Sequence, residues 1–191
     1  GKAIDEFGYV WHMGENGIGI ADAGFSGDGG TAWSNYTTRI NVDAYGNTFS
    51  DVKSVQIFGG NTSAGWVALK NDGTVWVWGL CSGGHRGNGT LGGIELSPVK
   101  VDIPGNKFVI KVSAGISIMA LCDDGTIYSW GGVNDSSYDV FQSALGYAST
   151  GTAWQSPHIV DNVVGATGVC NHGRISFAWS DTKLWYCGHS K

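Results

Sequence analysis

The segment Lys70-Asn71-Asp72-Gly73-Thr74-Val75-Trp76-Val77-Trp78-Gly79 decides the fold of this 191-residue chain. Its Asp-Gly pair stands between two runs of β-forming residues, which is the strongest short-range signal for a hairpin. We expect a type I′ turn here, with a positive φ at both Asp72 and Gly73. In the following strand valine alternates with tryptophan, so both faces are apolar. A strand with two apolar faces packs against a neighbour on each side.

The same pattern recurs along the chain, at Phe7–Gly14, Cys122–Gly131 and Ser180–Gly188. The copies are separated by roughly 58 residues, a period too long for a helical-hairpin repeat and suited to one multi-stranded sheet per repeat. We expect structural roles for the turn and closing positions of these copies, namely Gly14, Gly73, Trp78, Gly79, Gly125, Trp130, Gly131 and Gly188.

A looser, extended stretch follows each closing glycine, and Pro98 and Pro157 open two of these stretches. Proline lacks an N–H group, so these stretches are predicted to form the outer edge strands of their sheets. Four short strands per repeat make a propeller blade. The predicted fold class is therefore all-β, a β-propeller of four-stranded antiparallel blades with about three to four blades present.

We interpret residues 1–191 as a single partial β-propeller, with repeats at roughly 1–50, 51–107, 108–165 and 166–191. The chain is predicted to start and end on copies of the same strand of the repeat, so its two ends do not complete a blade. We expect an ordered portion of a longer chain, or an open half-ring. Its expected partners include further blades, from the same longer chain or from partner subunits.

Residues 112–160 contain, in order, Val-Ser-Ala-Gly, Met-Ala-Leu, Asp-Gly-Thr-Ile-Tyr-Ser-Trp-Gly, Leu-Gly and Ser-Pro. This order resembles the repeat of the chromosome-condensation-regulator family, whose propellers usually have seven blades. The resemblance covers nearly all of residues 7–190. Met119 and His172 stand near a position where the family often has histidine, and Cys187 replaces the tryptophan found at Trp78 and Trp130. The resemblance implies one alternative function, an intracellular, cytoplasmic regulator of a small GTPase.

Composition narrows the class of protein further. Glycine accounts for 32 residues, 42% of residues are hydrophobic and nine are tryptophan, which excludes a coiled coil and a disordered chain. The net charge is −5 and the lysines and arginines are scattered, so we expect no nucleic-acid partner. No apolar run approaches the roughly 20 residues of a transmembrane helix, so no membrane insertion is predicted.

The sequence offers no pattern for catalysis, a metal or a cofactor. The run Gly83–Gly89 lacks the Gly-Lys-Ser/Thr ending of a phosphate loop, and we interpret it as a surface loop. The histidines and cysteines lack the spacing of a zinc site, and the aspartates are explained as turn residues. The four cysteines, Cys81, Cys122, Cys170 and Cys187, allow three disulfide pairings, and each suits a small buried position equally well. We predict that the chain is not an enzyme.

Aromatic residues in the long connections between strands are the best candidates for binding. Connections on a rigid scaffold carry binding residues, and aromatic rings beside small polar residues suit sugar faces or protein surfaces. The candidate ligand-binding residues are Trp33, Tyr36, His85, Arg86, Tyr138, Phe141 and Trp154. The leading hypothesis is a non-catalytic recognition or structural module of the adhesin type. It would bind glycan or protein on an extracellular surface or on a particle such as a virion.

Overall fold

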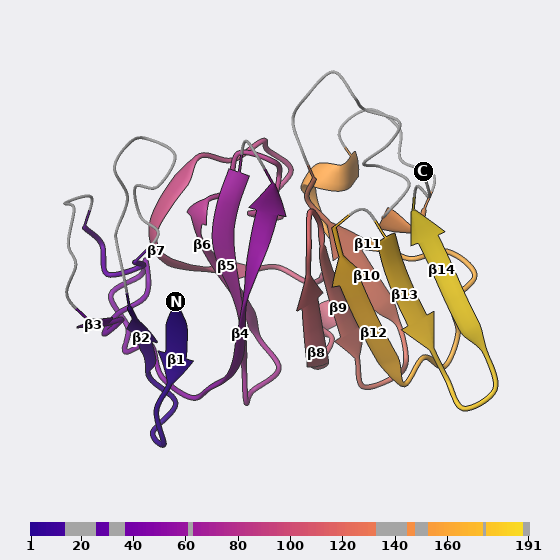
Figure 1. Ribbon diagram of the computed structural model, residues 1–191, viewed down its shortest axis with the longest axis horizontal. Helices are drawn as coiled ribbons and strands as arrows, with labels where there is room; N and C mark the ends of the chain where they lie inside the picture. Colours follow the sequence, from indigo (N-terminus) through magenta and orange to yellow (C-terminus); the bar gives the residue numbers. More distant parts are fainter. Residues whose placement is uncertain are drawn as a thin grey trace.

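Four antiparallel sheets make up the fold, and they stand side by side in chain order (Figure 1). The computed structural model describes residues 1–13, 26–30, 37–60, 63–132, 145–147, 153–173 and 175–188. The first sheet contains β1 (Lys2–Ile4), β2 (Val10–His12) and β3 (Thr38–Arg39), and the second contains β4 (Val52–Gly60), β5 (Ser63–Lys70), β6 (Val75–Leu80) and β7 (Ile94–Val101).

The third sheet contains β8 (Val109–Ala114), β9 (Ile118–Cys122), β10 (Ile127–Trp130) and β11 (His158–Ile159), and the fourth contains β12 (Gly168–His172), β13 (Ile175–Trp179) and β14 (Leu184–Gly188). Two short 3-10 turns, η1 (Pro104–Asn106) and η3 (Ala153–Gln155), lie in the connections. The predicted fold class, antiparallel propeller blades, is confirmed. We call the sheets the first to fourth blades.

The central strand β6 packs on both faces, as its alternating sequence predicts. Val75 and Val77 belong to a core cluster shared with the third blade. Trp76 and Trp78 belong to a second cluster, which contains Val10 of the first blade. Because each blade shares one apolar cluster with each neighbour, the core lies between the sheets.

The hairpin turn before β6 differs from the predicted type I′ geometry. Gly73 has φ +78°, whereas Asp72 is not among the residues with positive φ. The Gly73 N–H donates to the Lys70 carbonyl at 3.1 Å, and the Lys70 N–H donates to the Thr74 carbonyl at 3.0 Å. This is a type I turn followed by a glycine bulge, which needs positive φ at one residue only. The Asp72 carboxylate instead accepts hydrogen bonds from the N–H and hydroxyl of Thr74.

One expectation about the first blade was wrong, namely that the chain starts on the Phe7–Gly14 copy. The structure has a strand, β1, that precedes this copy and pairs with β2. Three residues are too few for the alternation of β1 to be recognised in the sequence. On the other side of β2, β3 pairs with it at Thr38–Arg39, and the Ile40 N–H donates to the Val10 carbonyl at 2.9 Å.

The outer edges of the second and third blades are β7 and β11, as predicted from Pro98 and Pro157. At the other edge of the second, third and fourth blades lie β4, β8 and β12. Polar contacts between the blades join these three strands. The Gln56 side chain donates to the Val112 carbonyl and accepts from the Ala114 N–H, both at 3.0 Å. The Asn171 N–H donates to the Ser113 hydroxyl at 2.8 Å. These contacts hold the first strands of successive blades in register with each other.

Candidate functional site

The β6–β7 loop spans residues 81–93, and its first half, residues 81–87, lies largely inside the molecule. This corrects the interpretation of Gly83–Gly89 as a surface loop. Gly83, Gly84, His85 and Gly87 are buried. The Gly83 carbonyl accepts a hydrogen bond from the Gly132 N–H at 2.8 Å. Because glycine has no Cβ, the backbone of this loop can approach the backbone of the third blade closely. The first half of the loop therefore fills the space between the second and third blades.

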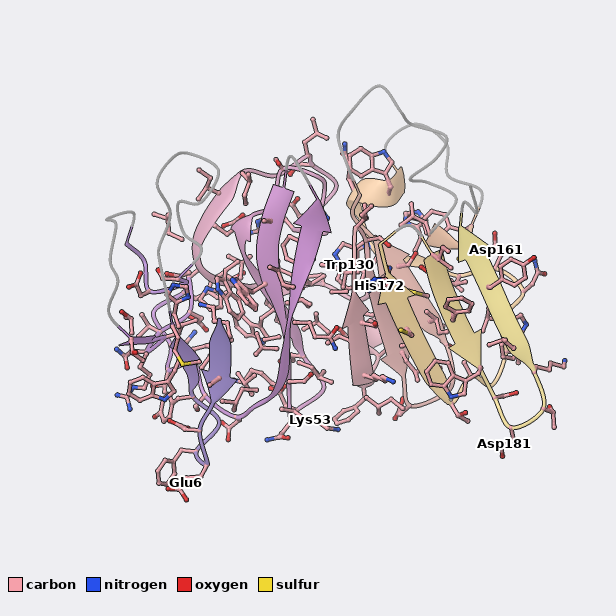
Figure 2. The ribbon with its side chains drawn as sticks, viewed as in Figure 1. Glu6, Lys53, Trp130, Asp161, His172 and Asp181 are labelled. Atoms are coloured by element: carbon pink, nitrogen blue, oxygen red, sulfur yellow. The ribbon has the colours of Figure 1, made fainter. Side chains whose placement is uncertain are left out.

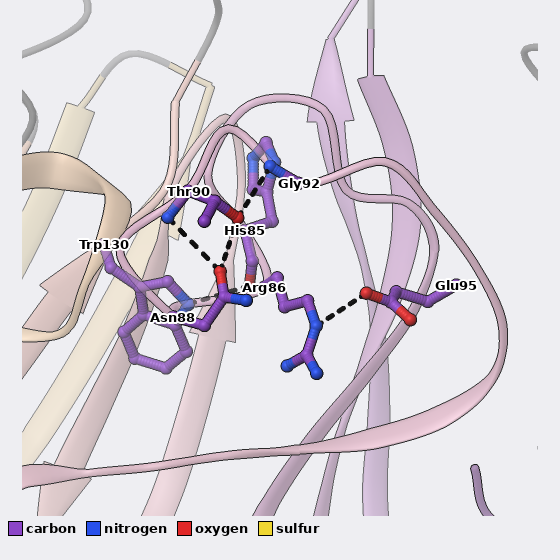
Figure 3. Close-up of polar contacts among 7 residues, drawn as sticks. All are labelled: His85, Arg86, Asn88, Thr90, Gly92, Glu95 and Trp130. Carbon is purple, nitrogen blue, oxygen red and sulfur yellow. Dashed lines mark hydrogen bonds and ion pairs between the residues drawn. The ribbon is translucent and has the colours of Figure 1, made fainter.

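His85 lies at the centre of this contact and is fully buried. Its ring stacks on Phe58 with centroids 4.4 Å apart, and its Nε2 lies 2.7 Å from the Ile116 carbonyl. Its own carbonyl accepts a hydrogen bond from the Trp130 Nε1–H at 2.9 Å (Figure 3). Figure 2 shows Trp130 at the contact between the second and third blades. The prediction that His85 contacts a ligand is contradicted by its burial.

Burial lowers the pKa of His85 to about 4, although the hydrogen bond to Ile116 opposes the shift. A neutral ring carries one proton, and the Ile116 carbonyl requires it on Nε2. The folded chain therefore holds His85 in the neutral form well below the ordinary histidine pKa of 6.5.

We expect the chain to lose stability as the pH falls from 7 to 5. Between pH 6.5 and 4 the unfolded chain binds a proton at His85 that the folded chain does not, so unfolding is favoured as the pH falls. The expected loss from His85 is about 2 kcal/mol of unfolding free energy by pH 5. Urea unfolding at several pH values measures it. His85→Gln should remove this part of the pH dependence, and His158→Gln, at an exposed position, should retain it. An unchanged pH slope in His85→Gln would contradict the assignment.

The outer half of the β6–β7 loop is accessible. Asn88 and Thr90 are exposed, and the Asn88 Oδ1 accepts a hydrogen bond from the Thr90 hydroxyl at 2.7 Å. Arg86 is half-buried, and its Nε lies 2.7 Å from Glu95 Oε1 (Figure 3). The ion pair with Glu95 restrains the Arg86 side chain. Arg86 remains a predicted binding residue, held in place by Glu95.

Of the other predicted ligand-binding residues, Trp154 is the one that lies in the described part of the chain. Trp154 is 3% exposed and its carbonyl accepts a hydrogen bond from the Gly131 N–H at 2.7 Å, so its prediction as a ligand contact is contradicted. Its ring packs against Gly84. Four predicted residues lie outside the described residues, as does Gly14: Trp33, Tyr36, Tyr138 and Phe141.

A charged cleft that the sequence analysis missed lies between the second and third blades. Its volume is about 480 Å³, and its walls are the turn at residues 72–75, the end of β7 and the segment 102–108. Asp72, Lys100, Asp102 and Lys107 bring charges of both signs to it. Phe108 adds an aromatic ring that is 47% exposed. We call these five residues the charged cleft. In the sequence, Asp72 was explained as a turn residue only.

Hydrogen bonds favour the ionised forms of two carboxylates at or beside the charged cleft, those of Asp72 and Asp124. Partial burial works against ionisation of Asp72, but the bonds from Thr74 and the charges of Lys70 and Lys100 lower its pKa overall. Lys107 is ion-paired with Asp124. The hydrogen bond from Lys107, together with those from Thr126, lowers the pKa of Asp124 to about 2. The hydrogen bond to Asp124 raises the pKa of Lys107, so Asp72 and Lys107 are both held in their charged forms at neutral pH.

Metal-ligating side chains do not cluster in the described part of the chain. No group of three or more His, Cys, Asp or Glu side chains there is placed to hold a metal ion. No helix among the described residues is long and apolar enough to cross a membrane. All four cysteines lie in the described part of the chain and none of them forms a disulfide; Cys81 and Cys122 are buried and Cys170 is exposed.

This chain is similar in sequence to two ubiquitin ligases and in structure to several solved propellers. No family model matches the chain. It is 28% identical over 189 residues to the E3 ubiquitin-protein ligase HERC2 of mouse and of human, covering 97% of this chain and 4% of the ligases. Its structure matches yeast RCC1 (Prp20), crystallised with Kap60, with a TM-score of 0.70 and 19% identity over 98% of this chain. The blades of this chain have the fold of the chromosome-condensation-regulator (RCC1) repeats of these neighbours.

Two further solved structures show the same RCC1-repeat architecture. Human WBSCR16 matches with a TM-score of 0.71 and 20% identity, over 97% of this chain. Prp20p of Saccharomyces cerevisiae, in a study of its binding to Gsp1p and histones, matches with a TM-score of 0.68 and 18% identity. This RCC1-repeat chain spans 43%, 41% and 42% of WBSCR16 and the two Prp20 chains, respectively. The likeness establishes the fold of the repeats.

Proposed function

We propose that this RCC1-repeat chain is a protein-binding module of an intracellular regulator. Support comes from the yeast relative, which was crystallised with Kap60 and studied for binding to Gsp1p and histones. The four cysteines form no disulfide, which fits a reducing compartment better than an extracellular one. The earlier hypothesis of an adhesin-like surface protein that binds glycan loses support, because His85 and Trp154 are buried.

The charged cleft is the observation that carries this proposal. Lys100 and Asp102 are exposed side chains on one wall, and Phe108 lies beside them. An aromatic ring among charges of both signs suits a protein surface that carries both signs, since charge complementarity selects the partner and the ring supplies apolar contact. A polyanion would be repelled by Asp72 and Asp102. The expected partner is therefore a protein.

A charge swap at the cleft tests the proposal. Lys100→Glu combined with Asp102→Lys keeps the net charge and reverses the order of charges along the cleft wall. With immobilised Gsp1p, a histone mixture and Kap60 as probes, we expect at least one to bind. The swap should weaken that binding by about tenfold or more.

The matched control is the swap Asp181→Lys with Lys183→Asp, at the exposed β13–β14 turn seen in Figure 2. It also keeps the net charge and should leave the affinity unchanged. Binding that is equally reduced by both swaps, or that survives the cleft swap, would show that the cleft is not the binding site. Absence of binding to all three probes would argue against the proposed partner class.

A more specific candidate is regulation of a small GTPase, which is favoured by the binding of Prp20p to Gsp1p. If this chain acts in that way, it should accelerate release of a fluorescent GDP analogue from Gsp1p, and the cleft swap should reduce the acceleration. Binding without accelerated release would limit the role of the chain to binding. The measurement is the release rate at increasing concentrations of the chain.

A further inference from the structure

Phe108 lies over the turn that precedes β6, and its backbone is held on both sides. A Cβ at Gly73 would lie 2.7 Å from the Phe108 ring, so the ring rests on a position that only glycine leaves open. The Val109 N–H donates to the Gly73 carbonyl at 3.2 Å, and the Phe108 carbonyl accepts from the Asp123 N–H at 3.0 Å. The half-exposed ring is therefore fixed in place at the wall of the charged cleft.

Beside this ring, the Asp72 carboxylate keeps one oxygen for an outside donor. Its Oδ1 accepts both bonds from Thr74, from the N–H at 3.0 Å and from the hydroxyl at 2.6 Å. No residue in the described part of the chain forms a hydrogen bond or an ion pair with Oδ2. Asp72 is exposed, so this oxygen can bind a donor that enters the cleft.

The balance of charge in the cleft favours a cation. Lys107 is paired with Asp124, so its charge is already compensated. The remaining charges on the cleft walls are the carboxylates of Asp72 and Asp102 and the ammonium group of Lys100, and all three residues are exposed. Two carboxylates against one ammonium group attract a positively charged group from a partner.

The cleft lies inside the row of blades, where both of its walls have neighbours. The second blade shares one apolar cluster with the first blade and another with the third, and the third blade shares a further cluster with the fourth. Figure 1 shows these two blades with a blade on each side. The side chains of the cleft are therefore exposed although each wall is packed on both faces.

We propose that the charged cleft binds an arginine side chain of the partner protein. The guanidinium group would stack on Phe108 and donate hydrogen bonds to Asp72 Oδ2 and to Asp102. A planar guanidinium can stack on a ring and donate from its edge at the same time, whereas the compact, strongly hydrated ammonium group of lysine suits such a site less well. The inference rests on the proposed function, because it names the group that the partner presents to the cleft.

Three small probes test the chemistry of the site without the partner. They are a capped Gly-Arg-Gly tripeptide and matched tripeptides with lysine or citrulline in place of arginine. In ¹H–¹⁵N NMR titrations of the whole chain, the arginine tripeptide should cause saturable shifts of the amide signals of Gly73, Thr74 and Val109. We expect the lysine tripeptide to bind about threefold more weakly or worse. Citrulline has the shape of arginine without its charge and should cause no saturable shifts.

Two conservative variants remove the proposed contacts without removing the turn. Asp72→Asn keeps an oxygen that can accept from Thr74 but removes the charge, and Phe108→Leu keeps an apolar side chain over Gly73 but removes the ring. Each should weaken binding of the arginine tripeptide by about fivefold or more. If Phe108→Leu fails to fold, which near-ultraviolet circular dichroism would reveal, Asp72→Asn still decides the result.

The sign of a third variant distinguishes a cation site from an anion site. Lys100→Gln removes a like charge, so it should strengthen binding of the arginine tripeptide by about twofold or more. The matched control is Asp181→Asn, which removes a carboxylate from the exposed β13–β14 turn, away from the cleft, and should leave the affinity unchanged (Figure 2). Weaker binding in Lys100→Gln would overturn the proposal, as would equal binding of the arginine and citrulline tripeptides or no saturable shift with arginine.

Failure of this inference can be told apart from failure of the proposed function. If the cleft charge swap weakens binding of Gsp1p, histones or Kap60 but the arginine tripeptide is not preferred, the cleft binds protein by other contacts and only the arginine site is lost. If the tripeptides behave as expected but none of the three protein probes binds, the arginine site stands and the proposed partner class is wrong.

Discussion

Replacing Trp130 with alanine is expected to cost about 4 kcal/mol of unfolding free energy. The indole is fully buried in the cluster shared by the second and third blades. Its Nε1–H donates to the His85 carbonyl, so the substitution also removes a bond that anchors the β6–β7 loop. Since small domains are stable by only about 5 to 15 kcal/mol, this loss should be evident in urea or thermal unfolding.

Two further variants separate the causes of the Trp130 effect. Trp130→Phe keeps most of the apolar packing but leaves the His85 carbonyl without this donor, so we expect a loss of about 2 kcal/mol. Trp179→Ala removes an indole of the same size from a position that is 37% exposed, and it should cost clearly less than Trp130→Ala. Equal losses for Trp130→Ala and Trp179→Ala would contradict the structural assignment.

Substitution of Gly83 by alanine is the other change for which we expect a large effect. A Cβ at this position would lie 1.8 Å from the Gly132 carbonyl oxygen and 2.5 Å from the His85 ring. Neither neighbour can move easily, because one is backbone and the other is a buried ring bonded to Ile116. We expect a loss of about 3 kcal/mol or more, as for other overpacked cores. Chemical unfolding measures it.

Gly93 provides a matched control in the same loop. A Cβ there would meet nothing within 4 Å, and Gly93 is not among the glycines with positive φ. Gly93→Ala should therefore change the stability by no more than about 0.5 kcal/mol. A comparable loss in both variants would show that the β6–β7 loop tolerates no alanine for a general reason, and the specific contact with Gly132 would not explain the effect.

Local pattern alone predicted the blades well. The Val-Trp alternation of residues 75–78 indicated a strand packed on both faces, and both clusters are present. Turn type was predicted less well, because Asp-Gly fits a type I′ turn and a type I turn with a glycine bulge equally. The hydrogen bonds of Lys70 with Gly73 and Thr74 decide between them. Strand β1 was missed because three residues carry too little periodicity.

The candidate binding site was harder to predict, because accessibility depends on contacts between distant residues. A glycine-rich run with a histidine suggests an exposed loop, yet His85 stacks on Phe58 and approaches Ile116. The charged cleft unites a turn near residue 73 with the segment 102–108, about 30 residues later. Arg86, in contrast, could be predicted as an accessible cation but not as the partner of Glu95.

The sequence by itself determined the sheet class and the recurrence of the hairpin, because these depend on side-chain alternation and turn chemistry within short segments. Only the tertiary structure decided which residues are accessible. Trp76 shows the reason: its alternation with valine predicts an apolar strand face, but its burial depends on Val10 and Ile40, which come from a blade more than 30 residues earlier in the chain.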